Sequence, residues 1–170
     1  MTTRLILRER HHQVICRHAK ATYPEECCGV LIGSSRREGS DQSDQGDQEM
    51  ELALVEQVLS IENERQDSRH NRFLITPETV LAAHRQARAL GLDVLGYYHS
   101  HPDHPAKPSE YDREHAWPGM SYLIVSVEGG EIADTRSWRL VEDRSRFDEE
   151  QLDHGAVPAG AAHHVEEVSR

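Results

Sequence analysis

The chain has few lysines and more acidic than basic residues. Only two of its 170 residues are lysines, Lys20 and Lys107, and its formal net charge at pH 7 is -11. Because binding to nucleic-acid phosphates needs clustered Lys and Arg, this composition argues against a nucleic-acid partner. An acidic surface can instead attract a basic patch on another protein.

Cysteines and long apolar runs are also scarce. Cys16, Cys27 and Cys28 are an odd number of cysteines, which argues against a disulfide framework and favours a reducing compartment. We interpret the adjacent pair as small buried apolar residues rather than as a redox or zinc site. No stretch approaches the length of a membrane span, and the apolar run at residues 5–7 is too short for a signal peptide. We therefore expect a cytoplasmic protein that does not enter a membrane.

The length fits one domain with a single core, which we place at residues 1–147. Residues 34–48 are rich in Gly, Ser, Asp and Gln with almost no apolar side chain, which predicts a disordered loop inserted between two strands. Residues 148–170 are polar and Gly/Ala-rich, which predicts a disordered tail.

Apolar segments with strand and helix periodicity alternate along the rest of the chain. We predict strands at residues 5–7, 28–33, 50–61, 72–75, 92–99, 121–127 and 132–141. Helices are predicted at residues 11–22 and 77–90 and from Ser109 onward, the second with Thr76 as N-cap and Pro77 in its first turn. Strands separated by helices indicate an α/β fold built around a mixed sheet.

The stretch most suggestive of chemistry begins at the end of the predicted strand at 92–99. His99 and His101 would lie on one face at its end, because strand side chains alternate, and Asp112 follows eleven residues later. Two imidazole nitrogens and one carboxylate oxygen suit Zn²⁺, and three protein ligands leave a position for water, as in catalytic zinc sites. A His-x-His pair is also common in exposed loops without metal. Asp112 and the stiffening prolines between it and the pair favour the metal interpretation.

Two segments together resemble the JAMM signature of the MPN-plus (Mov34/PAD-1) metallopeptidases. The first is His-Ser-His-Pro at 99–102 followed by Ser109 and Asp112, with the family's spacing at every position. The second is residues 23–33, in which Glu26 stands three residues before Gly29 ahead of an apolar strand. The resemblance extends over roughly residues 3–141.

The resemblance implies a fold and a set of roles. The fold would be a curved mixed β-sheet flanked by helices, similar to that of cytidine deaminases, although the His-x-Glu and Pro-Cys-x-x-Cys elements of deaminase chemistry are missing. One Zn²⁺ would be held by His99, His101 and Asp112. Glu26 would act as general base and acid, and the Ser109 hydroxyl would stabilise the oxyanion.

Some alternatives to these roles remain open at the level of sequence. Glu25 replaces Glu26 if the strand register shifts by one, since successive side chains point to opposite faces. Ser109 also fits the N-cap of a helix, with Asp112 completing a capping box. His104 and His115 lie close enough in sequence to replace a ligand.

The resemblance also suggests a substrate. Family members cleave after the C-terminal glycine of ubiquitin or ubiquitin-like proteins, and some small prokaryotic members process sulfur carriers of the ubiquitin fold. Residues 112–122 are too few for the large insertion of members specific for ubiquitin chains. We therefore expect a sulfur carrier with a Gly-Gly tail, bound along a strand edge. The alternatives are a non-catalytic MPN scaffold and a hydrolase of small amides or peptides.

Overall fold

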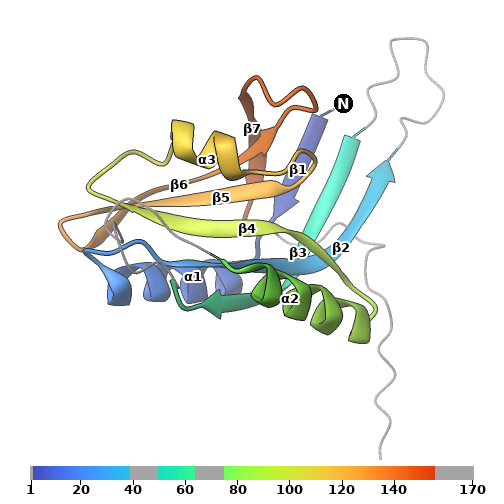
Figure 1. Ribbon diagram of the computed structural model, residues 1–170, viewed down its shortest axis with the longest axis horizontal. Helices are drawn as coiled ribbons and strands as arrows, with labels where there is room; N and C mark the ends of the chain where they lie inside the picture. The colour runs from blue at the N-terminus through green and yellow to red at the C-terminus, as the bar shows by residue number, and fades with distance from the viewer. Residues whose placement is uncertain (1, 39–49, 64–74, 156–170) are drawn as a thin grey trace, which may run out of the picture.

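The computed structural model describes residues 2–38, 50–63 and 75–155 (Figure 1). The described strands are β1 (Thr2–Ile6), β2 (Cys28–Glu38), β3 (Met50–Ile61), β4 (Asp93–Pro102), β5 (Ser121–Glu128), β6 (Glu131–Leu140) and β7 (Phe147–Asp153). The described helices are α1 (Glu9–Thr22), α2 (Pro77–Ala89) and α3 (Glu110–His115).

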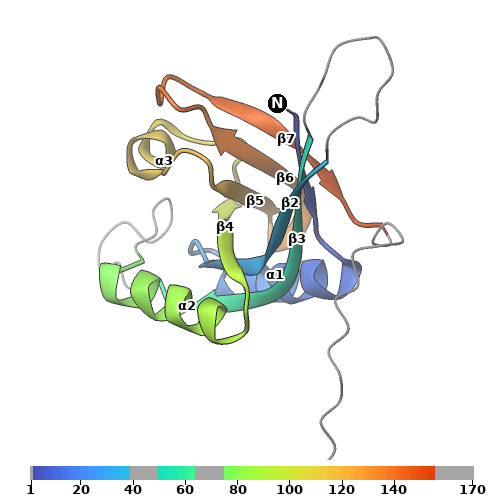
Figure 2. The same ribbon diagram turned by 90° about the vertical axis from the view of Figure 1, so that its right-hand side faces the viewer.

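The strands form one mixed sheet in the order β1-β3-β2-β4-β5-β6-β7. The pairs β1–β3, β1–β7 and β4–β5 are parallel, and the remaining pairs are antiparallel. The predicted α/β fold with a curved, helix-flanked mixed sheet is confirmed. Because β7 pairs back onto β1, the curvature goes as far as closing the sheet into a barrel (Figure 2).

The first half of β2, residues 28–33, has no polar side chain because helices cover both of its faces. Leu31 belongs to the core formed with Ile15 and Ala19 of α1. The neighbouring Val30 and Ile32 point the other way and pack with Ala83 and Ala87 of α2. This alternation places β2 and its partner β4 in the centre of the protein, as their unbroken apolar runs predict.

The helix starts agree with their sequence signals. The Thr76 side chain accepts a hydrogen bond from the Thr79 backbone N–H, with Pro77 as the first residue of α2. Helix α1 begins two residues before its predicted start, at Glu9.

Cys27 and Cys28 are buried as free thiols, as predicted.

Both predicted disordered segments require correction where the structure describes them. Residues 34–38 continue β2 and pair with residues 50–54 of β3, so the inserted loop does not start at 34. The domain boundary at 147 is wrong, since residues 147–153 form β7 and close the barrel. Residues 39–48 and 156–170 of these segments, and residues 72–74 of a predicted strand, lie outside the described residues.

Among the described helices, none is both long and apolar enough to cross a membrane.

Candidate active site

Strand β4 carries both histidines of the predicted site. Its parallel pairing with β5 runs through Pro102, so His99 and His101 are held in regular strand geometry with their side chains on one face. His99 is fully buried and His101 is 7% exposed. The fixed backbone lets the two rings meet, and the His99 Nε2 to His101 Nε2 distance is 3.0 Å.

The short helix α3 supplies Asp112. Ser109 is its N-cap: the Asp112 N–H donates to Ser109 Oγ, and the Ser109 N–H donates to Asp112 Oδ2. The predicted capping box is therefore confirmed. The Ser109 hydroxyl also donates to Asp112 Oδ2 at 2.7 Å. Because three bonds link these residues, the carboxylate has a fixed orientation toward the histidines.

The three side chains meet at distances that suit a small metal ion. Asp112 Oδ1 lies 3.2 Å from His99 Nε2, and Asp112 Oδ2 lies 3.5 Å from His101 Nε2. Ligands about 2.0–2.1 Å from a tetrahedral zinc lie about 3.3 Å apart, from the geometry of a tetrahedron. The observed distances of 3.0–3.5 Å bracket this value. The residues therefore fit a zinc ion without rearrangement of the backbone.

The hydrogen bonds at the rim of the cluster leave acceptor atoms at its centre. His101 Nδ1 lies 2.9 Å from the Pro105 carbonyl oxygen, which can only accept, so this nitrogen is the donor. In the neutral ring, His101 Nε2 then carries a lone pair that faces a carboxylate and a second imidazole. Acceptors at such distances repel one another unless a proton or a cation lies between them, and this supports a cation-binding role.

The electrostatics of the cluster support the same role. Burial opposes a charge on Asp112, but the two histidines beside it outweigh burial and hold the pKa of Asp112 below its usual value. Burial lowers the pKa of His99, which favours the neutral, ligating form. Burial also acts against a charge on His101, but its bonds to Asp112 and Pro105 raise the pKa of His101 overall. An anionic carboxylate beside imidazoles is a ligand set typical of zinc.

Glu26 lies beside this cluster. It is 4% exposed, and its carboxyl group interacts electrostatically with His101 and Asp112. Burial is the main cause that raises the pKa of Glu26 to about 8, while His101 acts against the rise and Asp112 adds to it. Glu25, the alternative base, is only half-buried. The position of Glu26 therefore favours it over Glu25 for proton transfer at the site.

Two residues that the sequence analysis did not single out hold Glu26 in place. The Cys27 N–H donates to Ser100 Oγ at 2.8 Å, and the Asn63 side chain donates to the Glu26 carbonyl oxygen at 3.1 Å. Ser100 could have been found, because a residue between two facing histidines must point toward the opposite face. Asn63 lies at the start of a polar stretch with no periodicity to mark it.

The remaining alternatives concern His104 and His115 as ligands and the second role of Ser109. His104 and His115 are exposed, and neither belongs to the cluster of His99, His101 and Asp112 that could hold an ion. The His115 ring instead stacks on Tyr111 at 4.0 Å between ring centroids. The Ser109 hydroxyl gives its single proton to Asp112, so donation to an oxyanion would require this bond to break.

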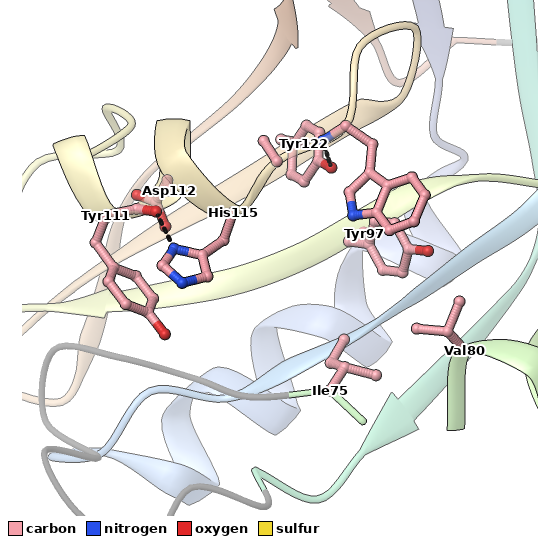
Figure 3. A pocket seen from close by; sticks show the side chains of 9 residues that line it. Ile75, Val80, Tyr97, Tyr111, Asp112, His115 and Tyr122 are labelled. Carbon is pink, nitrogen blue, oxygen red and sulfur yellow. Dashed lines mark hydrogen bonds between the residues drawn. The ribbon is translucent and has the colours of Figure 1, made fainter. Parts of the chain in front are cut away.

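A cavity of about 160 Å³ opens beside Asp112 (Figure 3). It lies between α3 and the start of α2, and Figure 3 shows Ile75 and Val80 facing Tyr111 and His115 across it. Its lining is mainly aromatic and aliphatic: Ile75, Val80, Tyr97, Tyr111, Asp112, His115, Ala116, Trp117 and Tyr122. Trp117 is 66% exposed at this position. Asp112 is the residue that this cavity shares with the cluster.

Three curated relatives match between 44% and 63% of the chain. A desampylase of Haloferax volcanii is 33% identical over 107 residues, which are 62% of this chain and 66% of that protein. Tail tip assembly protein K of Escherichia phage N15 is 30% identical over 63% of this chain and 34% of its own. A probable TtuB-protein conjugate cleaving protease of Thermus thermophilus is 35% identical over 44% of this chain and 50% of its own. The chain thus spans less than two thirds of the length of each.

A solved structure and a family model match more of the chain. A protein of Desulfitobacterium hafniense, solved in solution, is 30% identical with a TM-score of 0.70 and covers 96% of this chain and 99% of its own. The model of the prokaryotic homologs of the JAB domain matches residues 8–141, which include Glu26, both histidines and Asp112. The chain therefore belongs to the prokaryotic JAB family.

Proposed function

We propose that the protein is a zinc-dependent peptidase that hydrolyses the amide or isopeptide bond after the C-terminal glycine of a ubiquitin-like sulfur-carrier protein. The observation that carries the proposal is the convergence of His99, His101 and Asp112 at 3.0–3.5 Å with the Glu26 carboxyl group beside them. A scaffold module would have no need for buried acceptor atoms held in this arrangement.

The proposed roles follow from the contacts of each side chain. His99, His101 and Asp112 would hold the zinc ion, which when bound supplies a hydroxide-like water near neutral pH and polarises a carbonyl group. Glu26 would take a proton from the attacking water and give it to the departing amine. A neighbouring cation favours the ionised form of Glu26 that this step needs, because it opposes the effect of burial.

Ser109 serves first to position Asp112, through the three bonds between the two residues. We also propose that its hydroxyl stabilises negative charge on the substrate oxygen, for which it would turn away from Asp112 Oδ2. The Pro105 carbonyl has the corresponding positioning role for His101, since it fixes the ring orientation and the ligating nitrogen.

The burial of the site favours a narrow, unbranched substrate segment. His99 and Glu26 are almost inaccessible, and a Gly-Gly tail has no side chains to prevent close approach of its backbone. Although the strand order closes as a ring, the registers leave residues 55–61 of β3 and 131–136 of β6 paired on one side only, so the described sheet keeps strand edges with which a tail could pair. We place the tail in the cavity between α3 and α2, because this cavity is lined by Asp112. The conjugate-cleaving relative from Thermus supports a protein conjugate as substrate.

The test uses a sulfur carrier of the ubiquitin fold whose Gly-Gly tail is joined by a peptide bond to a short reporter peptide. Mass spectrometry of the products should show cleavage directly after the second glycine by the zinc-loaded wild-type protein. Glu26→Gln should lower kcat by about 10²–10⁴-fold, the usual contribution of a general base. Glu25→Gln is the matched control and should retain activity close to wild type.

A second substrate, with alanine replacing the last glycine of the carrier, tests whether cleavage requires the Gly-Gly tail. It should be cleaved much more slowly than the parent fusion. Equal cleavage of both fusions, or cleavage of the reporter peptide without its carrier, would favour a hydrolase of small peptides. Equal rates for wild type and Glu26→Gln would refute the assigned base.

A further inference from the structure

A second group of potential metal ligands lies away from the candidate active site. Glu9 and His12 are one turn apart on α1, and His154 directly follows β7. One ligand atom from each of the three lies within 4.8 Å of the others. Figure 2 shows the end of β7 descending beside the first turns of α1, which brings these distant parts of the chain together. The ring centroids of His12 and His154 are 4.7 Å apart.

Each of the three side chains is oriented by a bond to its other polar atom. Gln13 Nε2 donates to Glu9 Oε1 at 3.0 Å. His154 Nδ1 lies 3.2 Å from the Leu7 carbonyl oxygen and must be the donor to it. His12 Nε2 lies 3.1 Å from Thr135 Oγ1 and 3.3 Å from Cys16 Sγ, and when it donates to the Thr135 hydroxyl the neutral ring keeps a lone pair on Nδ1. This arrangement matches metal sites, in which outer partners fix the orientation and tautomer of the ligating side chains.

These bonds leave Glu9 Oε2, His12 Nδ1 and His154 Nε2 available to a cation. Glu9 Oε2 lies 4.0 Å from His12 Nδ1, which is longer than a hydrogen bond and somewhat longer than the spacing of zinc ligands. Because the Glu9 side chain is 64% exposed, it can turn toward the imidazoles at little cost. The His12 side chain is only 21% exposed, so it has less freedom to move than Glu9.

We propose that Glu9, His12 and His154 form a second site for a divalent transition-metal ion, for which zinc is the representative. Two imidazoles and one carboxylate suit zinc and its neighbours better than magnesium or calcium, which prefer oxygen ligands. The ion would join the start of α1 to the end of β7, the strand that closes the barrel. It therefore acts as a structural clamp, with weaker affinity than the buried site because its ligands are more exposed and further apart.

Zinc binding is measured by isothermal titration calorimetry and by metal analysis after equilibrium dialysis, in a His101→Ala background that lacks a ligand of the first site. The proteins compared are His101→Ala alone and the same variant with His12→Ala, His154→Ala or His84→Ala. His84 is an exposed histidine of α2 and provides the matched control. Circular dichroism checks that each protein is folded before titration.

We expect His101→Ala and its His84→Ala derivative to bind one zinc ion and to gain thermal stability on binding. The His12→Ala and His154→Ala derivatives should lose both effects. A folded His101→Ala protein without bound zinc, or equal binding by all four proteins, would overturn the second site. The proposed peptidase site is tested separately, since its failure would appear as equal zinc content in wild type and His101→Ala.

Discussion

The bond from the Cys27 N–H to Ser100 Oγ is a direct connection between the two halves of the candidate active site. Ser100 stands between the two histidines on β4, and Cys27 follows Glu26. The donor and acceptor are 2.8 Å apart, and both residues are buried. Ser100→Ala removes the acceptor and leaves a buried N–H without this partner, while the backbone bond from the Ser100 N–H to the Cys27 carbonyl oxygen remains.

We expect Ser100→Ala to lower both the stability of the protein and its catalytic rate. A buried polar group that loses its partner destabilises a protein by about 1–3 kcal/mol. For a chain of this size, each kcal/mol lowers Tm by about 2–4 °C. The second part concerns catalysis: Glu26 loses one of the bonds that hold its segment, and displacement of a catalytic group by about 1 Å can lower the rate by about 100-fold. We therefore expect a lower kcat, with KM and zinc content unchanged.

The assay combines urea denaturation with steady-state cleavage of the carrier fusion well below the Tm of each protein. Ser35→Ala, an exposed serine on β2, is the matched control and should change the free energy of unfolding by about 0.5 kcal/mol or less. A Ser100→Ala protein with wild-type kcat would refute the positioning role, even if its stability falls. A variant that loses zinc would show that the bond supports the histidines rather than Glu26.

Three further predictions address packing, pH dependence and substrate binding. Gly29→Ala should destabilise the fold by about 1–3 kcal/mol or more, measured by urea denaturation, because a Cβ there would lie 2.1 Å from the Tyr98 ring. Burial raises the pKa of Glu150 in the folded protein. The favourable contribution of this group to folding stability is therefore complete below its unfolded pKa and is lost as pH rises through its folded pKa. Denaturation at pH 4–7 should show wild type losing stability relative to Glu150→Gln. Trp117→Ala should raise KM for the carrier fusion by about 5–30-fold without loss of stability, whereas Leu90→Ala, also exposed, should not.

Local signals in the sequence were sufficient for most elements near the site. Thr76 and Pro77 mark the start of α2, and Ser109 with Asp112 marks the start of α3, because capping depends only on residues within one turn. The alternation of side chains along a strand places His99 and His101 on one face. These are short-range effects, and a sequence pattern can represent them.

Strand β7 could not be found in this way. Its inward position is occupied by Glu150, whose carboxylate accepts hydrogen bonds from Ser121 and Ser137, so the strand has no apolar alternation. Its pairing with β1 joins residues almost 150 positions apart in sequence, with Arg4 opposite Gln151. The polar end of β2 was missed for a similar reason, since only its pairing with β3 makes it a strand.

The zinc content of three proteins shows whether His99, His101 and Asp112 form a hydrolytic metal site. Wild type, Glu26→Gln and His101→Ala are saturated with zinc, freed of excess by dialysis and analysed by mass spectrometry. We predict equal zinc in wild type and Glu26→Gln, with Glu26→Gln inactive, and one ion fewer per chain in His101→Ala. Equal zinc in a folded His101→Ala protein, or no zinc in wild type, would contradict it.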